Sequence, residues 1–247
     1  MAFEQPARDE LHARLASVLE VVYLIFNEGY SATAGDNWMR PSLCDEALRL
    51  GRIVAGLMPQ EAEVHGLLAL MEIQASRAAA RIDDHGAPVL LLEQNRARWD
   101  QRLICRGLAA LDRADTLGGT RGPYALQAAI AACHARARSA DQTDWPRITA
   151  LYDELAQLTP SPVVELNRAV AVSMAFGPAA GLEIVDRLGD DAALRRYHLL
   201  PSVRADLLAR LGRLDEARTE FERAAGLTQN MREQTLLRQR AAACEKS

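Results

Sequence analysis

The chain has 247 residues, a net charge of −4 and a pI near 5.8, and 49% of its residues are apolar. It is long enough to bury a hydrophobic core, and its acidic balance argues against direct binding to nucleic acid. Ala (44) and Leu (35) make up almost a third of the chain, whereas aromatic residues are only 5%. This composition predicts an all-α protein rather than a β-sandwich or barrel, because Ala and Leu favour helices.

Residues 1–7 are expected to form a linker, and residues 8–117 an N-terminal helical part. Apolar residues recurring at a period near 3.6 predict helices over 8–27, 41–58, 61–81 and 94–117. Ser42 and Asp45 have the spacing of a capping box at the start of the second helix. Residues 89–92 are expected to be a short extended segment.

The second part, residues 118–247, repeats this alternation and is expected to form one continuous domain with the first. Its predicted helices are 124–138, 145–158, 162–176, 179–188, 195–211, 214–227 and 231–243. Asp144 and Ser161 each stand just before a first helical turn that contains proline, so they are expected to cap their helices. The chain as a whole is predicted to contain about eleven helices and almost no strand.

An internal repeat near the C-terminus indicates how these helices are arranged. The segment LGRLDEA, residues 211–217, resembles the turn of a tetratricopeptide (TPR) unit, with small or aromatic residues at the expected distances from Gly212: Ala205, Ala217, Phe221 and Ala224. Gly177 precedes Gly212 by 35 residues, close to the 34-residue period of that repeat. We therefore expect a TPR-like array of helical hairpins whose concave side is lined by alternate helices.

Sequence motifs of catalysis are absent, since the chain contains no HExxH, no GxSxG, no Walker loop and no dinucleotide fingerprint. Cys133 and His134 are adjacent on a predicted helix and point to different faces, which disfavours a metal pair. Asp83-Asp84-His85 is interpreted as a solvated turn, and the glycine-rich residues 118–122 as a connector. We expect no catalytic residue, no metal and no cofactor.

The cysteines Cys44, Cys105, Cys133 and Cys244 are scattered without a CxxC pair, as is typical of free thiols in a reducing compartment. No signal peptide is recognisable, and the longest charge-free stretches have 14 residues, too short to span a bilayer. A cytoplasmic location is expected.

A first set of candidate binding residues is expected to face the concave groove. Asn167 interrupts an apolar helical stripe and stands beside Arg168; Tyr124, Gln127 and His134 share one face of another predicted helix. Arg196 and Tyr197 belong to a small basic and aromatic cluster. The alternatives are a buried polar network for Asn167, a core face for the Tyr124 group, and a solvated helix start for Arg196 and Tyr197.

A second candidate surface combines Asn27 and Glu28, at the end of the first helix, with Arg96, Trp99 and Asp100. Trp99 is a candidate contact aromatic. The alternatives are a packed helix corner for the first pair, an ordinary helix-surface ion pair for Arg96 and Asp100, and a core position for Trp99.

Several segments together resemble one family. They are YLIFNEGY (23–30), LLALM (67–71), RWD (98–100), GPYALQAAIAA (122–132), DW (144–145), LY (151–152), PSPVVELNRAVA (160–171) and YHLLP (197–201). This pattern is similar to the C-terminal extension of a group of bacterial extracytoplasmic-function RNA polymerase sigma factors that carry a TPR-like domain. The resemblance covers about residues 3–240.

The resemblance implies that two sigma regions, which bind core polymerase and read the promoter, would precede Phe3 in the parent protein. The extension itself would not contact DNA, and the family supplies no catalytic residue to carry over. It would regulate or support sigma activity in transcription initiation through contacts to its own sigma regions, core polymerase or a regulator. The alternative function is a sensor for a small acidic ligand, with Arg168 or Arg196 as counter-ion.

Overall fold

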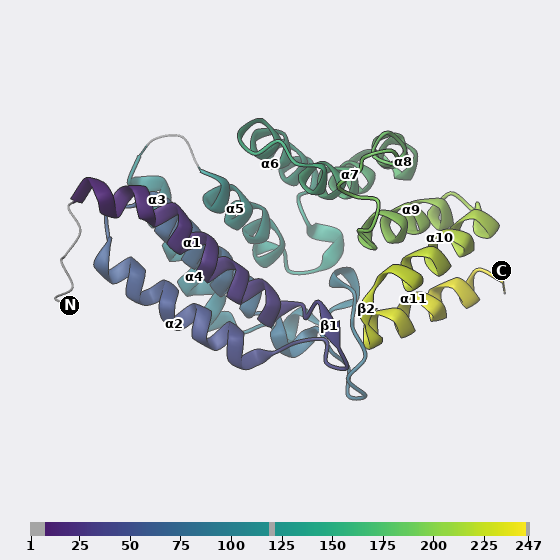
Figure 1. Cartoon of the computed structure of the whole chain (residues 1–247), viewed down its shortest axis with the longest axis horizontal. Helices are drawn as coiled ribbons and strands as arrows, with labels where there is room; N and C mark the ends of the chain where they lie inside the picture. Colours follow the sequence, from purple (N-terminus) through teal and green to yellow (C-terminus); the bar gives the residue numbers. More distant parts are fainter. Residues whose placement is uncertain (1–7, 119–121, 246–247) are drawn as a thin grey trace.

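The computed structural model describes residues 8–118 and 122–245, with side chains from residue 14 onward. Within these residues the chain is an arch of eleven α-helices, in which consecutive helices pack as neighbours (Figure 1). The all-α prediction is confirmed. The expected linker, residues 1–7, and most of the glycine-rich connector lie outside the described residues. None of the described helices is both long enough and apolar enough to cross a membrane.

Six helices form the N-terminal side and the middle of the arch: α1 (Arg8–Tyr30), α2 (Pro41–Leu57), α3 (Ala62–Ala75), α4 (Gln101–Thr116), α5 (Pro123–Arg136) and α6 (Trp145–Leu158). Five complete it: α7 (Pro162–Phe176), α8 (Pro178–Arg187), α9 (Leu199–Arg210), α10 (Leu214–Leu227) and α11 (Met231–Ala243). Asp144 and Ser161 cap α6 and α7 as predicted, each accepting a backbone N–H in the first turn. The helix predicted over 195–211 is α9, which begins four residues later than expected, at Leu199.

The predicted repeat unit is the α9–α10 hairpin. Gly212 takes the left-handed backbone conformation, with φ 76°, in the turn between the two helices. Ala205, Ala217 and Ala224 are each 0% exposed, and Phe221 is 1% exposed. These small residues let the two helices approach closely, while Phe221 fills the space between them.

Two predicted helices are shorter than expected around residues 76–100. The α3 helix ends at Ala75, where the Ser76 hydroxyl donates to the Ile73 carbonyl, and α4 begins only at Gln101. Asp100 accepts two N–H groups of the first turn of α4, and its own N–H donates to the Ser76 carbonyl. The intervening segment contains short 3-10 turns at Ala78–Ala80, Leu91–Glu93 and Arg96–Arg98. The extended segment expected at 89–92 is therefore wrong in its second half.

The capping box predicted for α2 is also wrong. The residue before the first turn is Arg40, no side chain caps the helix, and Pro41 opens it. Proline has no backbone N–H that would need a capping acceptor, and its fixed φ suits the first helical turn. The helix therefore begins at Pro41 without a cap from the Ser42 hydroxyl.

The hydrophobic core runs through the arch as successive clusters. One joins α1, α2 and α3, another joins α3 to α7, and a third joins α7 to α11. The second of these includes Ala69 and Ala171, so it crosses the boundary expected near residue 117.

A clasp joins the two ends of the arch: β1 (Ala34–Gly35) pairs in parallel with β2 (Gln229–Asn230), and Figure 1 shows them side by side. Asn230 is 1% exposed, and its side-chain amide donates to the carbonyls of Ala32 and Asn37. Its oxygen accepts the N–H groups of residues 232 and 233, which caps α11. All four hydrogen-bonding positions of this amide are filled.

Candidate functional site

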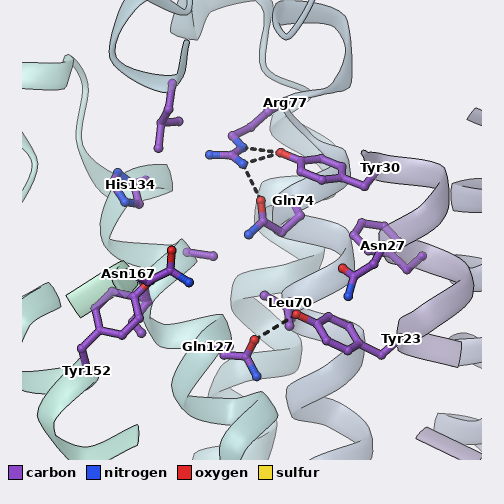
Figure 2. A pocket seen from close by; sticks show the side chains of 14 residues that line it. Tyr23, Asn27, Tyr30, Leu70, Gln74, Arg77, Gln127, His134, Tyr152 and Asn167 are labelled. Carbon is purple, nitrogen blue, oxygen red and sulfur yellow. Dashed lines mark hydrogen bonds between the residues drawn. The ribbon is translucent and has the colours of Figure 1, made fainter. Parts of the chain in front are cut away.

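A polar cavity of about 310 Å³ opens on the inner side of the arch, between α1, α3, α5, α6 and α7 (Figure 2). Nine of its lining side chains are polar or charged: Tyr23, Asn27, Tyr30, Gln74, Arg77, Gln127, His134, Tyr152 and Asn167. The apolar ones are Phe26, Leu70, Leu91, Ile130 and Ala131. Its size is at the low end for small-molecule sites.

The α1 helix supplies four of these side chains because of their spacing. Tyr23, Phe26, Asn27 and Tyr30 recur at three and four residues and therefore share one face of the helix. Phe26 is 1% exposed and stacks on Tyr30, with ring centroids 5.5 Å apart. The YLIFNEGY segment thus presents two tyrosines and one amide to the cavity on a base of buried phenylalanine.

Hydrogen bonds fix part of the lining. Tyr23 Oη donates to Gln127 Oε1 at 3.0 Å, and Gln127 Nε2 donates to the Pro123 carbonyl at 3.1 Å. Farther along the same wall, the Arg77 guanidinium donates to the Tyr30 hydroxyl and to Gln74 Oε1. Figure 2 shows these two linked groups on the same side, facing His134, Asn167 and Tyr152.

Three arginines gather at one end of the cavity, where α1, α3 and α5 end. Arg81 donates to the carbonyl of Tyr30, and Arg96 donates to the carbonyls of His134 and Ala137. These two therefore neutralise the last carbonyls of α1 and α5. Arg77 instead bonds to uncharged side-chain oxygens, and within the described chain no carboxylate lies within 4.0 Å of any of the three.

His134 is a neutral base in this setting. Its side chain is 8% exposed, its ring packs edge-on against Trp145 at 5.1 Å, and its Nδ1 atom is buried without a hydrogen-bond partner. Burial, and after it the charges of Arg77 and Arg96, together lower the pKa of His134 to about 4. The imidazole is therefore uncharged near neutral pH.

The structure brings together some of the predicted groove residues. Gln127, His134 and Asn167 line the cavity, and Asn27, expected on a second surface, lines the same cavity. Tyr124 is half-buried and lies outside the cavity lining: its ring meets Tyr23 edge-on at 5.4 Å, and its backbone N–H donates to Glu63.

The other predicted groove residues lie elsewhere. Arg168, one residue after Asn167, pairs with Glu165 at 2.9 Å and Asp153 at 3.3 Å, because a step of one residue turns the side chain to another helix face. Arg196 is exposed, outside the cavity lining, and Tyr197 packs against the C-terminal core cluster.

The second candidate surface does not form one site. Glu28 accepts hydrogen bonds from Thr33 and pairs with Arg40 at 3.1 Å, which secures the loop after α1. Trp99 is 4% exposed and belongs to a small core cluster. Asp100 caps α4, and Arg96 donates to a carbonyl at the end of α5. The two residues therefore do not form an i,i+4 ion pair with each other.

Of the nine polar lining residues, sequence reasoning missed five: Tyr23, Tyr30, Gln74, Arg77 and Tyr152. The i, i+3/i+4, i+7 recurrence of polar-tipped side chains in YLIFNEGY is the signal that could have revealed Tyr30. No comparable signal distinguishes Arg77 among 28 arginines.

Metal-ligating groups are not clustered in the described ranges: no three of His, Cys, Asp and Glu are placed to hold an ion. Asp83 accepts the N–H groups of His85 and Ala87, which makes the Asp-Asp-His segment a hydrogen-bonded turn.

Comparisons with known proteins place the sequence beside others of undefined role. Residues 14–115 match the model of a family of unknown function, DUF6596. An uncharacterized protein of Rhizobium meliloti (R00370) is 48% identical over 236 residues, which are 96% of this chain and 55% of that protein. The chain thus spans about half the length of the curated relative it matches.

A solved structure supports the architecture. The crystal structure of TTC0263, a thermophilic TPR protein of Thermus thermophilus, aligns with 94% of this chain and 99% of its own, with a TM-score of 0.57 and 16% identity. At this identity the likeness concerns the fold alone. The TPR-like helical array predicted from residues 205–224 is therefore confirmed.

Proposed function

We propose that this chain is a regulatory protein-interaction domain of a bacterial RNA polymerase sigma factor, acting in transcription initiation. Its partner would be its own sigma regions, core polymerase or a regulator. The observation that carries the proposal is that the segments resembling the sigma-factor extension supply much of one cavity. Tyr23, Asn27, Gln127 and Asn167 come from three such segments far apart in the chain.

The fold and the length of the relative support this proposal. TPR-like arrays offer a preformed concave surface, on which a partner segment binds without reorganising the scaffold. The Rhizobium meliloti relative extends well beyond the aligned residues, so it has room for further domains. We propose that those domains include sigma regions.

The test is the binding of the purified chain to two partners, measured separately by calorimetry. One is bacterial core RNA polymerase, and the other is the part of the relative that lies outside the aligned 236 residues. Binding to the second partner alone would define an intramolecular lid, and removing the domain should then raise transcription. Binding to core polymerase alone would define an additional anchor, and removal should lower transcription. Binding to neither would contradict the proposal for these two partners and leave only a separate regulator.

A matched pair of variants locates the contact. Asn167→Ala removes an amide that lines the cavity, whereas Arg168→Ala removes the next side chain, which pairs with Glu165 and Asp153 outside it. We expect Asn167→Ala to weaken binding at least about tenfold, which corresponds to about 1.4 kcal/mol of binding free energy. Arg168→Ala should leave the affinity unchanged. If the two substitutions changed the affinity equally, the cavity would not be part of the interface.

A further inference from the structure

The cavity carries an unbalanced positive charge. Of its fourteen lining residues one is a permanent cation, Arg77, and none is Asp or Glu. Arg81 and Arg96 lie nearby but donate to helix-terminal carbonyls, while among the described residues Arg77 bonds only to the hydroxyl of Tyr30 and the amide of Gln74. Such a guanidinium can exchange these neutral acceptors for a carboxylate, a stronger partner.

Further polar groups of the cavity lack partners. His134 is 8% exposed, and its Nδ1 atom has no hydrogen bond, which is costly unless a bound group or water completes it. The Asn167 side chain is exposed to solvent and makes no hydrogen bond within the described residues, so its amide is available to a ligand; Figure 2 shows it between Tyr152 and the opposite wall. A side-chain amide offers both a donor and an acceptor, which matches a peptide group.

The geometry favours a carboxylate over a phosphate. A dianionic phosphate is typically held by several cations or by the N–H groups of a helix N-terminus. Here a single guanidinium faces the cavity, which matches one negative charge rather than two. The nearby ends of α1, α3 and α5 are C-terminal ends, which offer carbonyls and not the free N–H groups that hold a phosphate. The volume of about 310 Å³ suits one or two residues rather than a helix.

From this arrangement we infer that the cavity binds a carboxylate with a neighbouring amide, its charge on Arg77 and its amide beside Asn167 and His134. An acidic residue of a partner peptide and a free acylated amino acid share this chemistry. The inference deepens the proposed function and rests on its assignment of the cavity as the binding site. It names Arg77, rather than Arg168 or Arg196, as the counter-ion.

The experiment titrates the full chain with four probes, followed by NMR of the arginine Nε and side-chain amide signals. The probes are an aspartate blocked at both ends as amides, the same compound with asparagine, free N-acetylaspartate, and inorganic phosphate. We expect the blocked aspartate to bind at least tenfold more tightly than the asparagine compound. Tighter binding of N-acetylaspartate than of the blocked aspartate would identify a free metabolite as the natural ligand. Tighter binding of the blocked aspartate would identify a peptide.

Two substitutions of one type test the counter-ion. Arg77→Gln should abolish the preference for aspartate over asparagine, whereas Arg196→Gln, an equal loss of charge at an exposed site, should preserve it. Arg77→Lys, which keeps the charge, should retain part of the preference. Thermal unfolding verifies that each variant is folded, and the aspartate–asparagine comparison on the unmodified chain needs no variant.

Three results would overturn the inference: equal affinity for the aspartate and asparagine probes, an undiminished preference in Arg77→Gln, or phosphate as the tightest ligand. If these occur while the Asn167 variant still loses protein binding, the carboxylate chemistry is wrong and the proposed function stands. If the aspartate probe binds but neither protein partner does, the cavity is a ligand site and the proposed interaction fails.

Discussion

The C-terminal hairpin α9–α10 and the region around α3 and α4 use different connections between their helices. The first has a short turn at Gly212 and a core of alanines around Phe221. The second separates its helices by residues 76–100, which hold the buried Arg81 and Trp99 and bring Arg77 to the cavity. The regular unit thus stabilises the array, whereas the irregular connection brings a charged side chain to the cavity.

The largest expected effect lies in the regular unit. Phe221→Ala removes a side chain that is 1% exposed between α10 and its neighbours, so it should lower the free energy of unfolding by about 3–5 kcal/mol. Urea denaturation measures this. Phe176→Ala is the control: that ring is 67% exposed, and its removal should change stability by less than about 0.5 kcal/mol.

The clasp should come next. Asn230→Ala leaves the carbonyls of Ala32 and Asn37 without their donor and removes the cap of α11, so we expect a loss of about 2–3 kcal/mol. Asn230→Asp keeps the cap acceptor but sets a carboxylate oxygen against the two carbonyls at a buried position, so it should also destabilise the chain. If both variants unfold at the same urea concentration as the unmodified chain, the ends of the arch are not joined in solution.

A substitution where two helices of the N-terminal half approach closely should have a smaller effect on stability. A Cβ atom at Gly66 would lie 2.7 Å from the backbone nitrogen of Ala125, so Gly66→Ala should cost about 1–3 kcal/mol. Gly56→Ala is the matched control, because no atom lies within 4 Å of its added Cβ and alanine favours the helix by about 0.5–1 kcal/mol. Opposite signs for the two substitutions in thermal unfolding would support the packing.

The smallest effect belongs to the cavity and depends on pH. The pKa of His134 is about 4 in the folded chain, below the ordinary value of about 6.5, so below pH 6.5 only the unfolded chain gains this proton. Protonation therefore favours unfolding, and His134 costs stability as the pH falls from about 6.5 toward 4, by at most about 1.4 kcal/mol per pH unit. Urea denaturation at pH 7 and pH 5 measures this loss of unfolding free energy. The loss between the two pH values should be smaller for His134→Gln than for the unmodified chain. An identical loss in both proteins would mean that the imidazole is charged in the fold.

The fold was largely predictable from the sequence, because helical periodicity and glycine turns are local signals. Asp144, Ser161 and the residues around Gly212 each indicated a feature that the structure contains. The stretches 76–81 and 94–100 were less predictable, since their helical pattern yields to the hydrogen bonds of Ser76 and Asp100, which depend on packing between α3 and α4.

The cavity was only partly predictable. Asn167 stood out as a polar residue in an apolar stripe, and Gln127 and His134 as polar residues on one helix face; all three line the cavity. Arg168 and Trp99 carry chemistry that suits a binding site, yet one pairs with surface carboxylates and the other is buried. Chemical type along the chain does not specify which helix face meets the concave side, because that depends on how distant helices pack.

The clasp changes how such an array can come apart. A linear stack of repeats contacts only its neighbours, so its terminal repeats fray and it can unravel from either end. Here residues 34 and 229 are paired, which links the first helical unit of the described chain to the last one. Closing so long a loop is entropically slow, so the pairing should form late in folding and afterwards couple hydrogen exchange in α1 to that in α11.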